Sequence, residues 1–462
     1  MKFRSTFLTC LFFAVSGCIS SGQTTTKPNI LFIFADDWGW ADLSCHDHPY
    51  IKTPNIDRLA KEGTDFTNFT VASGVCSPSR AAVMTGRFPA RFGINGHFAS
   101  VRSNTARKMP DWLDPSVPVL PRLLQEAGYM TGHFGKWHLT GSEVSDAPRP
   151  ELYGYDRVGA YNCSGELMPV HEDALNAIAL IEESQQQGKP FFINLWVHEP
   201  HTPFHTVQEY QDRFPDLPKA DNIYASVLSH ADDRIGQVLD TLDRLKLTDN
   251  TLVIFSSDNG PAGSGKAGKL IIKNDPATGD GYFGPSMGTT GGRKGRKRSL
   301  FQGGVGVPFL ARWPGNIEAG GLDDISWISA VDLLPTFCEI AEVKLPSELK
   351  LDGKSQLAVL TGEKAPLREK TLYWKRHSAG GKGNGIVGEY AVLDGKWKLL
   401  TDKPSRKREL YDVSRDPLEQ NDLSAQHPEQ VDTLIKKLED WKKTLPAEID
   451  EDVKSELRQT NR

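Results

Sequence analysis

Two short oxygen-rich pairs are the first residues whose types and spacing point to chemistry. Asp36-Asp37 and Asp258-Asn259 each close a run of apolar residues. Such runs are typical of strands buried on both faces of a parallel sheet, and the carboxyl ends of parallel strands meet at one edge, where ligands bind. Either pair alone also fits a loop cap. Three carboxylates and an amide oxygen brought together need a cation, and hard oxygen ligands favour Ca²⁺, or less well Mg²⁺, over zinc.

A second cluster is built around one cysteine. Cys76 is followed by Ser77 and Pro78, which suit the cap and the first position of a helix, and Gly86 suits its end. Cys76 would then sit just before a helix N-terminus, whose dipole and free N–H groups favour an anion. Arg80, one turn further on, adds a permanent positive charge. The pattern indicates an oxyanion site beside a reactive side chain, and a buried structural cysteine is the alternative.

The elements that must position these residues alternate along the chain. Apolar runs predict buried strands at 29–35, 191–197 and 251–255. Capped or amphipathic stretches predict helices at 53–63, 121–128 and 221–245. Strands that alternate with helices predict an α/β sheet wound on both faces by helices.

The pattern changes near residue 365. Apolar and polar residues alternate at 371–375, 390–400 and 409–413, which is typical of an antiparallel sheet with one face in solvent, and 431–445 reads as an amphipathic helix. We therefore predict a catalytic domain at 28–365, a small α+β domain at 366–445 and a loose, charged tail at 446–462.

The first residues predict export. Lys2 and Arg4 precede an apolar run too short to span a bilayer, and the string that ends in Cys18 resembles a bacterial lipobox. We interpret 1–17 as a signal peptide, Cys18 as lipidated and 18–27 as a linker; ordinary signal cleavage is the alternative. A lipid would then be the only membrane attachment, in the periplasm or on the outer membrane of a bacterium.

The bulk properties agree with an exported globular protein. The 462 residues are 38% hydrophobic and 24% charged, which supports a sizeable core. The net charge of −5 argues against nucleic acid as a partner. Cys45, Cys163 and Cys338 leave room for one disulfide in an oxidising compartment, and the sequence does not pair them.

The cysteine string resembles the signature of the sulfatase family, within the alkaline-phosphatase superfamily. It reads Cys76-Ser-Pro-Ser-Arg80, and Thr85-Gly86-Arg87 follows. The resemblance covers roughly residues 28–445 and includes four further segments: Gly135-Lys136-Trp137-His138, Pro200-His201-Thr202-Pro203, Lys297 ahead of Gln302-Gly303-Gly304, and Glu409-Leu-Tyr-Asp-Val413 with Arg415-Asp-Pro-Leu-Glu419. Gln302 and Gly306 depart from the usual Glu and Arg, which concerns the local support of Lys297.

The resemblance implies an alkaline-phosphatase-like fold, in which helices sandwich a mixed sheet and a smaller α+β domain follows. It implies that a formylglycine-generating enzyme oxidises Cys76 to formylglycine (3-oxoalanine), whose hydrate attacks sulfur. The implied metal ligands are Asp36, Asp37, residue 76, Asp258 and Asn259.

The remaining implied roles concern the sulfate group and its protons. Arg80, Lys136 and Lys297 would hold the sulfate oxygens. His201 would protonate the leaving oxygen and His138 would take a proton from the second hydroxyl at residue 76, because imidazole titrates near neutral pH. His198 and His205 flank His201 and are open to the same role.

The substrate is expected to be a sulfated polysaccharide or oligosaccharide, such as a marine algal glycan. The basic run 293–298 fits a grip on a polyanion and equally a solvated surface. Four further residues are candidates for substrate binding: Arg87, Arg91, His97 and Arg102.

Three alternative functions stay open. One is a related formylglycine hydrolase of phosphonates or phosphodiesters. Another is a non-catalytic, lipid-anchored glycan-binding protein. The third is direct catalysis by a Cys76 thiolate, which a helix N-terminus favours but which leaves the metal ligands unexplained.

Overall fold

The computed structural model describes residues 27–161, 171–263, 271–275, 279–284, 286–377, 388–402 and 407–460. The predicted signal peptide, Cys18 and all of the linker except Lys27 lie outside these residues, as does Cys163. Cys45, Cys76 and Cys338 carry free thiols. Among the helices of the described part, none combines the length and the apolar character needed to span a bilayer.

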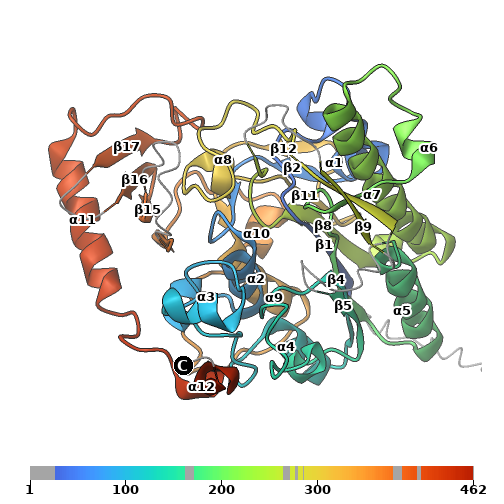
Figure 1. Ribbon diagram of the computed structural model, residues 1–462, viewed down its shortest axis with the longest axis horizontal. Coiled ribbons are helices and arrows are strands. Elements are labelled where there is room, and N and C mark those ends of the chain that lie inside the picture. Colours follow the sequence, from blue (N-terminus) through green and yellow to red (C-terminus); the bar gives the residue numbers. More distant parts are fainter. Residues whose placement is uncertain are drawn as a thin grey trace, which may run out of the picture.

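An eight-stranded mixed sheet forms the centre of the larger part (Figure 1). The order across the sheet is β12 (Gly321–Asp323), β2 (Thr64–Phe66), β11 (Phe309–Arg312), β8 (Thr251–Ser257), β1 (Asn29–Ala35), β6 (Phe191–Trp196), β4 (Met130–Lys136), β5 (Arg157–Tyr161). The five strands from β8 to β5 are parallel, and β11 runs antiparallel to β8 and β2. The three predicted strands are confirmed, and they lie side by side at the centre.

Both faces of this sheet are covered by helices. Alternate residues of β1 face opposite cores: Ile30 and Phe32 point to one, Leu31 and Ile33 to the other. The second core is closed by α1 (Pro54–Glu62), α5 (Asp173–Gln187) and α7 (Lys219–Arg244), and the first by α2 (Cys76–Thr85), α4 (Leu120–Glu126) and α9 (Leu333–Ile340). The helices predicted at 53–63, 121–128 and 221–245 are confirmed to within two residues, and the winding on both faces is confirmed.

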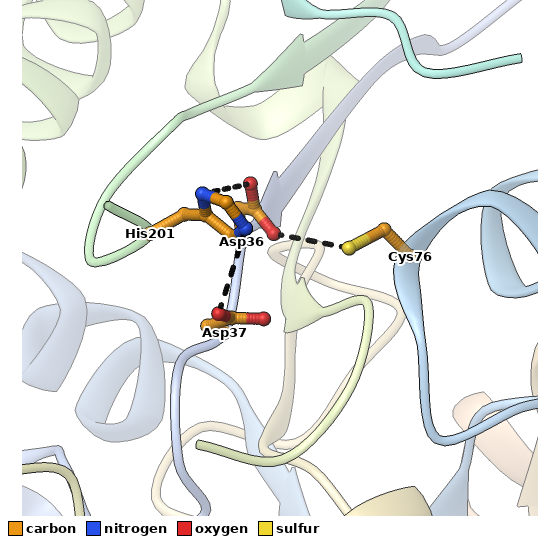
Figure 2. A group of neighbouring side chains, drawn as sticks. All are labelled: Asp36, Asp37, Cys76 and His201. Atoms are coloured by element: carbon orange, nitrogen blue, oxygen red, sulfur yellow. Dashed lines mark hydrogen bonds and ion pairs between the residues drawn. The ribbon is translucent and has the colours of Figure 1, made fainter. Parts of the chain in front are cut away.

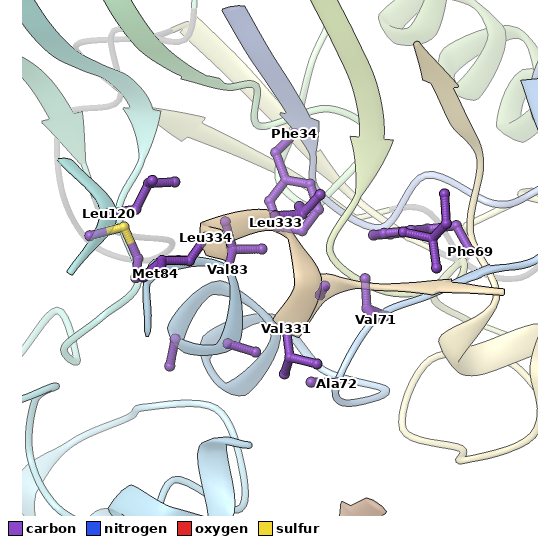
Figure 3. Packing of buried hydrophobic residues seen from close by; sticks show 14 of the residues in the cluster. Phe34, Phe69, Val71, Ala72, Val83, Met84, Leu120, Val331, Leu333 and Leu334 are labelled. Atoms are coloured by element: carbon purple, nitrogen blue, oxygen red, sulfur yellow. The ribbon is translucent and has the colours of Figure 1, made fainter. Parts of the chain in front are cut away.

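Helix α2 begins earlier than the sequence indicated. Its first residue is Cys76, and Val75 precedes it in an extended conformation without a side-chain cap. The hydroxyl of Ser77 accepts a hydrogen bond from the Phe98 N–H at 3.0 Å, so the prediction that Ser77 caps the helix is wrong. Gly86 ends the helix with φ 63°, as predicted. Figure 3 shows Val83 and Met84 of α2 packed against Leu333 and Leu334.

Shorter elements complete this part of the chain. They are β3 (Phe69–Thr70), α3 (Val101–Ala106), β7 (Phe204–His205), α6 (Gln208–Gln211), β9 (Ile271–Asp275), β10 (Gly279–Phe283), α8 (Gln302–Val305), β13 (Ile328–Ser329) and α10 (Leu357–Leu360). Strands β7, β10 and β9 form a small sheet, and β13 pairs with β3.

A second antiparallel sheet follows, at the left of Figure 1. Its strands are β14 (Leu372–Lys375), β15 (Tyr390–Asp394), β16 (Trp397–Thr401) and β17 (Arg408–Asp412), and α11 (Pro428–Lys442) packs on one face. The opposite face joins the core of the large sheet through Leu393 and Leu400. The expected solvent-facing side is therefore wrong for the central strands, and 390–400 is a hairpin that turns at Gly395. The boundary near residue 365 stays a prediction.

The tail is ordered by long-range contacts as far as residue 460. Val453 is buried beside Val101 and Trp112, and Arg458 pairs with the buried Asp111 at 2.6 Å. Helix α12 (Leu457–Thr460) lies below α3 in Figure 1. The expectation of a loose tail is therefore wrong for residues 446–460. Among its many charged residues, the tail carries Val453, which packs in a small apolar cluster, and Arg458, which pairs with Asp111.

Candidate active site

The large sheet brings both oxygen-rich pairs together. Strands β1 and β8 are parallel neighbours, so Asp36-Asp37 and Asp258-Asn259 leave the sheet at the same edge. The Asp37 N–H donates to Oδ1 of Asp258 at 3.2 Å. All four side chains are buried. The predicted convergence is what the geometry shows, and it follows from adjacent parallel strands.

Cys76 and His201 reach the same place from two other elements. Figure 2 shows the thiol at the start of α2 and the imidazole facing Asp36 and Asp37. Together these four residues offer ligand atoms that all lie within 4.8 Å of one another. Cys76 Sγ lies 3.6 Å from Asp36 Oδ1, and each ring nitrogen of His201 lies 3.9 Å from a different aspartate. His198 and His205 lie outside this group, which favours His201 for the role that the three could share.

Three cations surround the carboxylates. Arg80 donates to Asp258 Oδ2 from Nη2 at 2.7 Å and from Nε at 3.0 Å. Lys136 pairs with Asp36. Lys297 Nζ lies 2.5 Å from Asp37 Oδ1. The site thus holds three positive side chains against three aspartates.

Aromatic packing places Arg80. Its guanidinium lies 4.9 Å from the ring centre of Trp196 and 5.6 Å from that of Phe34. Trp196 ends β6 and Phe34 lies in β1, so the sheet itself supplies the platform. Cation–π contacts of this kind are strongest where water is excluded.

Two residues of the site have strained backbone conformations. Asp37 has φ 68° and His138 has φ 50°, in the left-handed region that non-glycine residues rarely adopt. His138 Nε2 lies 3.1 Å from the Phe98 carbonyl oxygen. Conformations of this kind persist where the surrounding structure enforces them, and they gather at active sites.

The pKa values of the buried aspartates are shifted in different directions by their surroundings. Burial acts to raise the pKa of Asp36, but His201 and Lys136 hold it well below its ordinary value. Burial, together with the charge of Asp36, raises the pKa of Asp258 to about 6 despite Arg80. Asp36 is therefore the most firmly ionised acid of the group.

The thiol of Cys76 is poorly suited to act as it stands. Burial, together with the nearby Asp258, raises its pKa well above the ordinary thiol value. Catalytic cysteines need the opposite shift, because the thiolate is the nucleophile. Burial and the neighbouring carboxylate of Asp258 therefore disfavour direct thiolate catalysis.

The ligand set fits a hard divalent cation. Asn259 Nδ2 donates to Asp37 Oδ1 at 2.7 Å, while Asn259 Oδ1 is buried and accepts no hydrogen bond from the described part of the chain. A buried carbonyl oxygen without a donor is costly unless a cation or another donor meets it. Oxygen atoms from Asp36, Asp37, Asp258 and Asn259 suit Ca²⁺ or Mg²⁺.

The four candidate substrate-binding residues differ in whether they lie near the cluster. His97 lies near the site, with its ring centre 6.4 Å from that of His138. Arg91 is held by Asp352 at 2.7 Å, Arg87 lies over Phe92, and Arg102 is exposed beside the tail. The structure brings only His97 of these four residues toward the cluster.

The basic run 293–298 is mostly structural. Arg293 lies 4.3 Å from the ring centre of Trp40, Lys294 pairs with Glu409, and Arg296 donates to backbone oxygens. Lys297 meets Asp37, and Arg298 is exposed. A continuous basic grip is therefore wrong, because tertiary contacts take up four of the five charges.

Two buried ion pairs that the sequence did not predict hold segments of the site in place. Glu419 accepts a hydrogen bond from the Gln302 N–H at 2.6 Å and pairs with Lys398 at 2.7 Å. This holds the turn that follows Lys297, where Gln302 departs from the family pattern. Arg234 donates to both oxygens of Glu199, two residues before His201. The only signal in the sequence was that Glu419 and Glu199 stand within or beside recognisable motifs.

The mixed α/β sheet, with its buried cluster of acidic and basic side chains at the carboxyl ends of the strands, has the alkaline-phosphatase-like fold of its structural neighbours. Residues 28–343 match the family described as Sulfatase, and residues 295–445 match the C-terminal region of N-sulphoglucosamine sulphohydrolase. The chain belongs to the sulfatase family and is a sulfuric ester hydrolase. This sets aside the non-catalytic glycan-binding alternative.

Its relatives include carbohydrate sulfatases. The N-acetylgalactosamine-6-O-sulfatase of Bacteroides thetaiotaomicron is 27% identical, over 91% of this chain and 94% of its own length. Arylsulfatase A of Homo sapiens is 30% identical, over 82% and 76%. The crystal structure of Ps i-CgsB in complex with k-i-k-neocarrahexaose aligns with a TM-score of 0.77 and 25% identity, over 94% of this chain and 99% of that one.

Proposed function

We propose that this enzyme removes sulfate from a sulfated polysaccharide or oligosaccharide, by means of formylglycine formed from Cys76. The observation that carries the proposal is the position of Cys76. It is the first residue of α2, it lies 3.6 Å from Asp36, and it is buried among Arg80, Lys136 and Lys297, which we call the cage. The glycan is supported by a relative named N-acetylgalactosamine-6-O-sulfatase and by a similar structure solved in complex with k-i-k-neocarrahexaose. A marine algal glycan is the first candidate.

The cage binds the sulfate group. Arg80, Lys136 and Lys297 lie around residue 76 and neutralise the sulfate oxygens as charge moves onto them in the transition state. Formylglycine, as its hydrate, supplies one hydroxyl that attacks sulfur and a second hydroxyl whose loss of a proton re-forms the aldehyde and expels sulfate from the first oxygen. A plain serine would leave a stable sulfate ester, and this chemical need explains why an oxidised cysteine is used.

A divalent cation, Ca²⁺ in preference to Mg²⁺, is held by Asp36, Asp37, Asp258, Asn259 and residue 76. It supplies positive charge beside the nucleophile. Calcium is favoured because it accepts a larger and less regular set of oxygen ligands. A titration of chelated protein with each metal, followed by melting temperature and by sulfate release, tests both the site and the choice of ion.

His201 delivers the proton to the leaving sugar oxygen. Burial lowers the pKa of His201 well below its ordinary value, against the attraction of Asp36. A bound sulfate ester adds negative charge next to the ring, so proton uptake by His201 accompanies substrate binding. His138 receives the proton of the second hydroxyl at residue 76, because its ring is held in place by the Phe98 carbonyl.

Maturation and location follow from the same proposal. A formylglycine-generating enzyme must act on Cys76 before folding buries it. The chain is exported, cleaved before Cys18 and lipidated there, which leaves it in the periplasm or on the outer membrane. Residues 28–365 act as the catalytic domain, 366–445 as the α+β domain and 446–462 as the C-terminal tail.

Mass spectrometry across Cys76 tests the proposal. Protein made together with a formylglycine-generating enzyme should show the formylglycine mass at residue 76 and release sulfate. Cys76→Ala should lose activity by a factor on the order of 10⁴ or more and keep its melting temperature. An unmodified cysteine in active protein would refute the mechanism, and hydrolysis of phosphonate esters in preference to sulfate esters would favour the related hydrolase.

A further inference from the structure

A group of basic side chains adjoins the cage on the side of Lys297. Arg298 is the next residue, and its N–H bonds to the carbonyl oxygen of Gly74, two residues before Cys76. Its side chain is exposed, whereas Lys297 points inward to Asp37. The loop thus presents one charge to the scissile sulfate and the next charge to the space beside it.

Two other segments bring positive charge to the same place. Arg107, at the end of α3, donates from Nη1 to the His97 carbonyl oxygen at 2.9 Å. Arg376, just beyond β14, donates from Nη1 to the Arg298 carbonyl oxygen at 2.8 Å. The neighbouring His377 N–H bonds to the Asn95 carbonyl oxygen at 2.7 Å, so the loop that carries His97 is attached to the small sheet.

These charges repel one another and lack carboxylate partners. The pKa of Arg107 lies below its ordinary value because the side chain is partly buried and because Arg298 repels its charge. Burial, together with the charges of Arg107, Lys297 and Arg298, lowers the pKa of His97 to about 4. Within the described ranges, no ion pair is formed by Arg107, Arg298 or Arg376, although Glu389 and Asp402 attract Arg376 from a greater distance.

The contrast with other arginines of the chain is informative. Arg80, Arg91 and Arg234 each meet a carboxylate directly. Neighbouring guanidinium groups left without one form a natural site for an oxyanion, because their planar N–H groups match carboxylate and sulfate geometry. The chain as a whole is acidic, with a net charge of −5, so this cluster is not a general surface property.

We propose that Arg107 and Arg298, with the His97 loop between them and Arg376 supporting Arg298, form a second anion-binding subsite. It takes another anionic group of the glycan, a sulfate or a carboxylate on the same or the adjoining sugar. The inference rests on the proposed function and narrows it, because the preferred substrate then carries at least two negative groups. Arg298 contributes to specificity, and Lys297 to the reaction.

The test compares three disaccharides. One carries a single sulfate, the second a further sulfate on the adjoining sugar, and the third a carboxylate there. For wild type, kcat/KM should be at least tenfold higher with a second anion, and added NaCl should reduce this preference. In the double variant Arg107→Gln/Arg298→Gln the preference should fall at least tenfold through a rise in KM. The second and third sugars distinguish sulfate from carboxylate as the natural group.

Matched controls separate charge from folding. Arg298→Lys should restore part of the preference, and Arg102→Gln, an exposed arginine on the same helix α3, should keep all of it. A preference that persists in the double variant, or that wild type never shows, overturns the subsite.

Calorimetric binding of the same three sugars keeps the two proposals separate. If wild type hydrolyses none of them but the second anion still strengthens binding tenfold through Arg107 and Arg298, the proposed function fails and the subsite stands. If hydrolysis proceeds and binding is indifferent to the second anion, the subsite fails alone.

Discussion

The candidate active site has two walls, each lined by basic side chains, and the two walls differ in how far these side chains are buried. On one wall, the side chains of Arg80 and Lys136 are 0% exposed and are paired with Asp258 and Asp36. On the other, the side chains of Lys297 and His201 are 13% and 19% exposed. The closed wall is a framework of paired charges completed by folding, whereas the open wall is partly accessible to solvent.

The supports of the two walls differ in kind. Arg80 is fixed by two aromatic rings of the central sheet. The loop of Lys297 is tied by backbone bonds, by the buried pair between Glu419 and Lys398, and by the pair between Glu409 and Lys294, whose side chain is 39% exposed. Buried pairs are costly to break, and exposed pairs contribute little, so mutations should separate stability from catalysis across the site.

The largest expected effect belongs to the closed wall. Arg80→Met should lower the free energy of unfolding by about 3–5 kcal/mol, because Asp258 is left buried without its partner. Activity should be lost as well. Urea denaturation of the metal-loaded enzyme measures the change, and a loss below about 1 kcal/mol would show that the framework is not structural.

Lys297→Met is the matched change on the open wall. We expect kcat/KM to fall by about 10²–10³-fold, since one donor to the developing charge is removed. The free energy of unfolding should change by about 1 kcal/mol or less. Steady-state kinetics alongside the same urea titration decides, and equal destabilisation in both variants would abolish the distinction between the walls.

His201→Asn sharpens the comparison further. Loss of the proton donor should reduce kcat about 10²-fold for a sugar sulfate, whose leaving oxygen needs a proton. Hydrolysis of 4-nitrophenyl sulfate should suffer much less, because its leaving group is stable as an anion. Equal losses on both esters would mean that His201 binds sulfate and does not act as the acid.

The smallest effect concerns the support of the open wall. Burial acts to raise the pKa of Glu409, but hydrogen bonds from Lys294 and Tyr411 lower it to about 2, against an ordinary value of 4.5. An acid whose pKa is lower in the folded than in the unfolded protein stabilises the fold above pH 4.5, and this stabilisation is lost as the pH falls toward 2. Glu409→Gln should therefore flatten this acid limb, with a change well below about 1 kcal/mol at pH 7. Melting temperatures from pH 2 to 7 measure it, and an unchanged limb would contradict the pairing.

Local patterns were enough to predict much of the site. The apolar runs that end in Asp36-Asp37 and Asp258-Asn259 predicted that these residues lie at one edge of the sheet. The string from Cys76 to Arg80 predicted the start of a helix. The capping role of Ser77 was wrong, because Phe98 from another segment supplied a better donor. The basic run was misread for a similar reason, since partners far away in the chain take up most of its charges.

The sequence by itself determined the class of the enzyme and predicted the nucleophile position and the ligand types, because these depend on residue identity and on spacing within single elements. Only the tertiary structure decided which charges are buried, how Glu199 and Glu419 support the site, and that Arg107, Arg298 and Arg376 gather beside it. Such contacts join residues that lie tens to hundreds of positions apart. Their energies come from desolvation and pairing, which are set by the surroundings and leave no periodic trace along the chain.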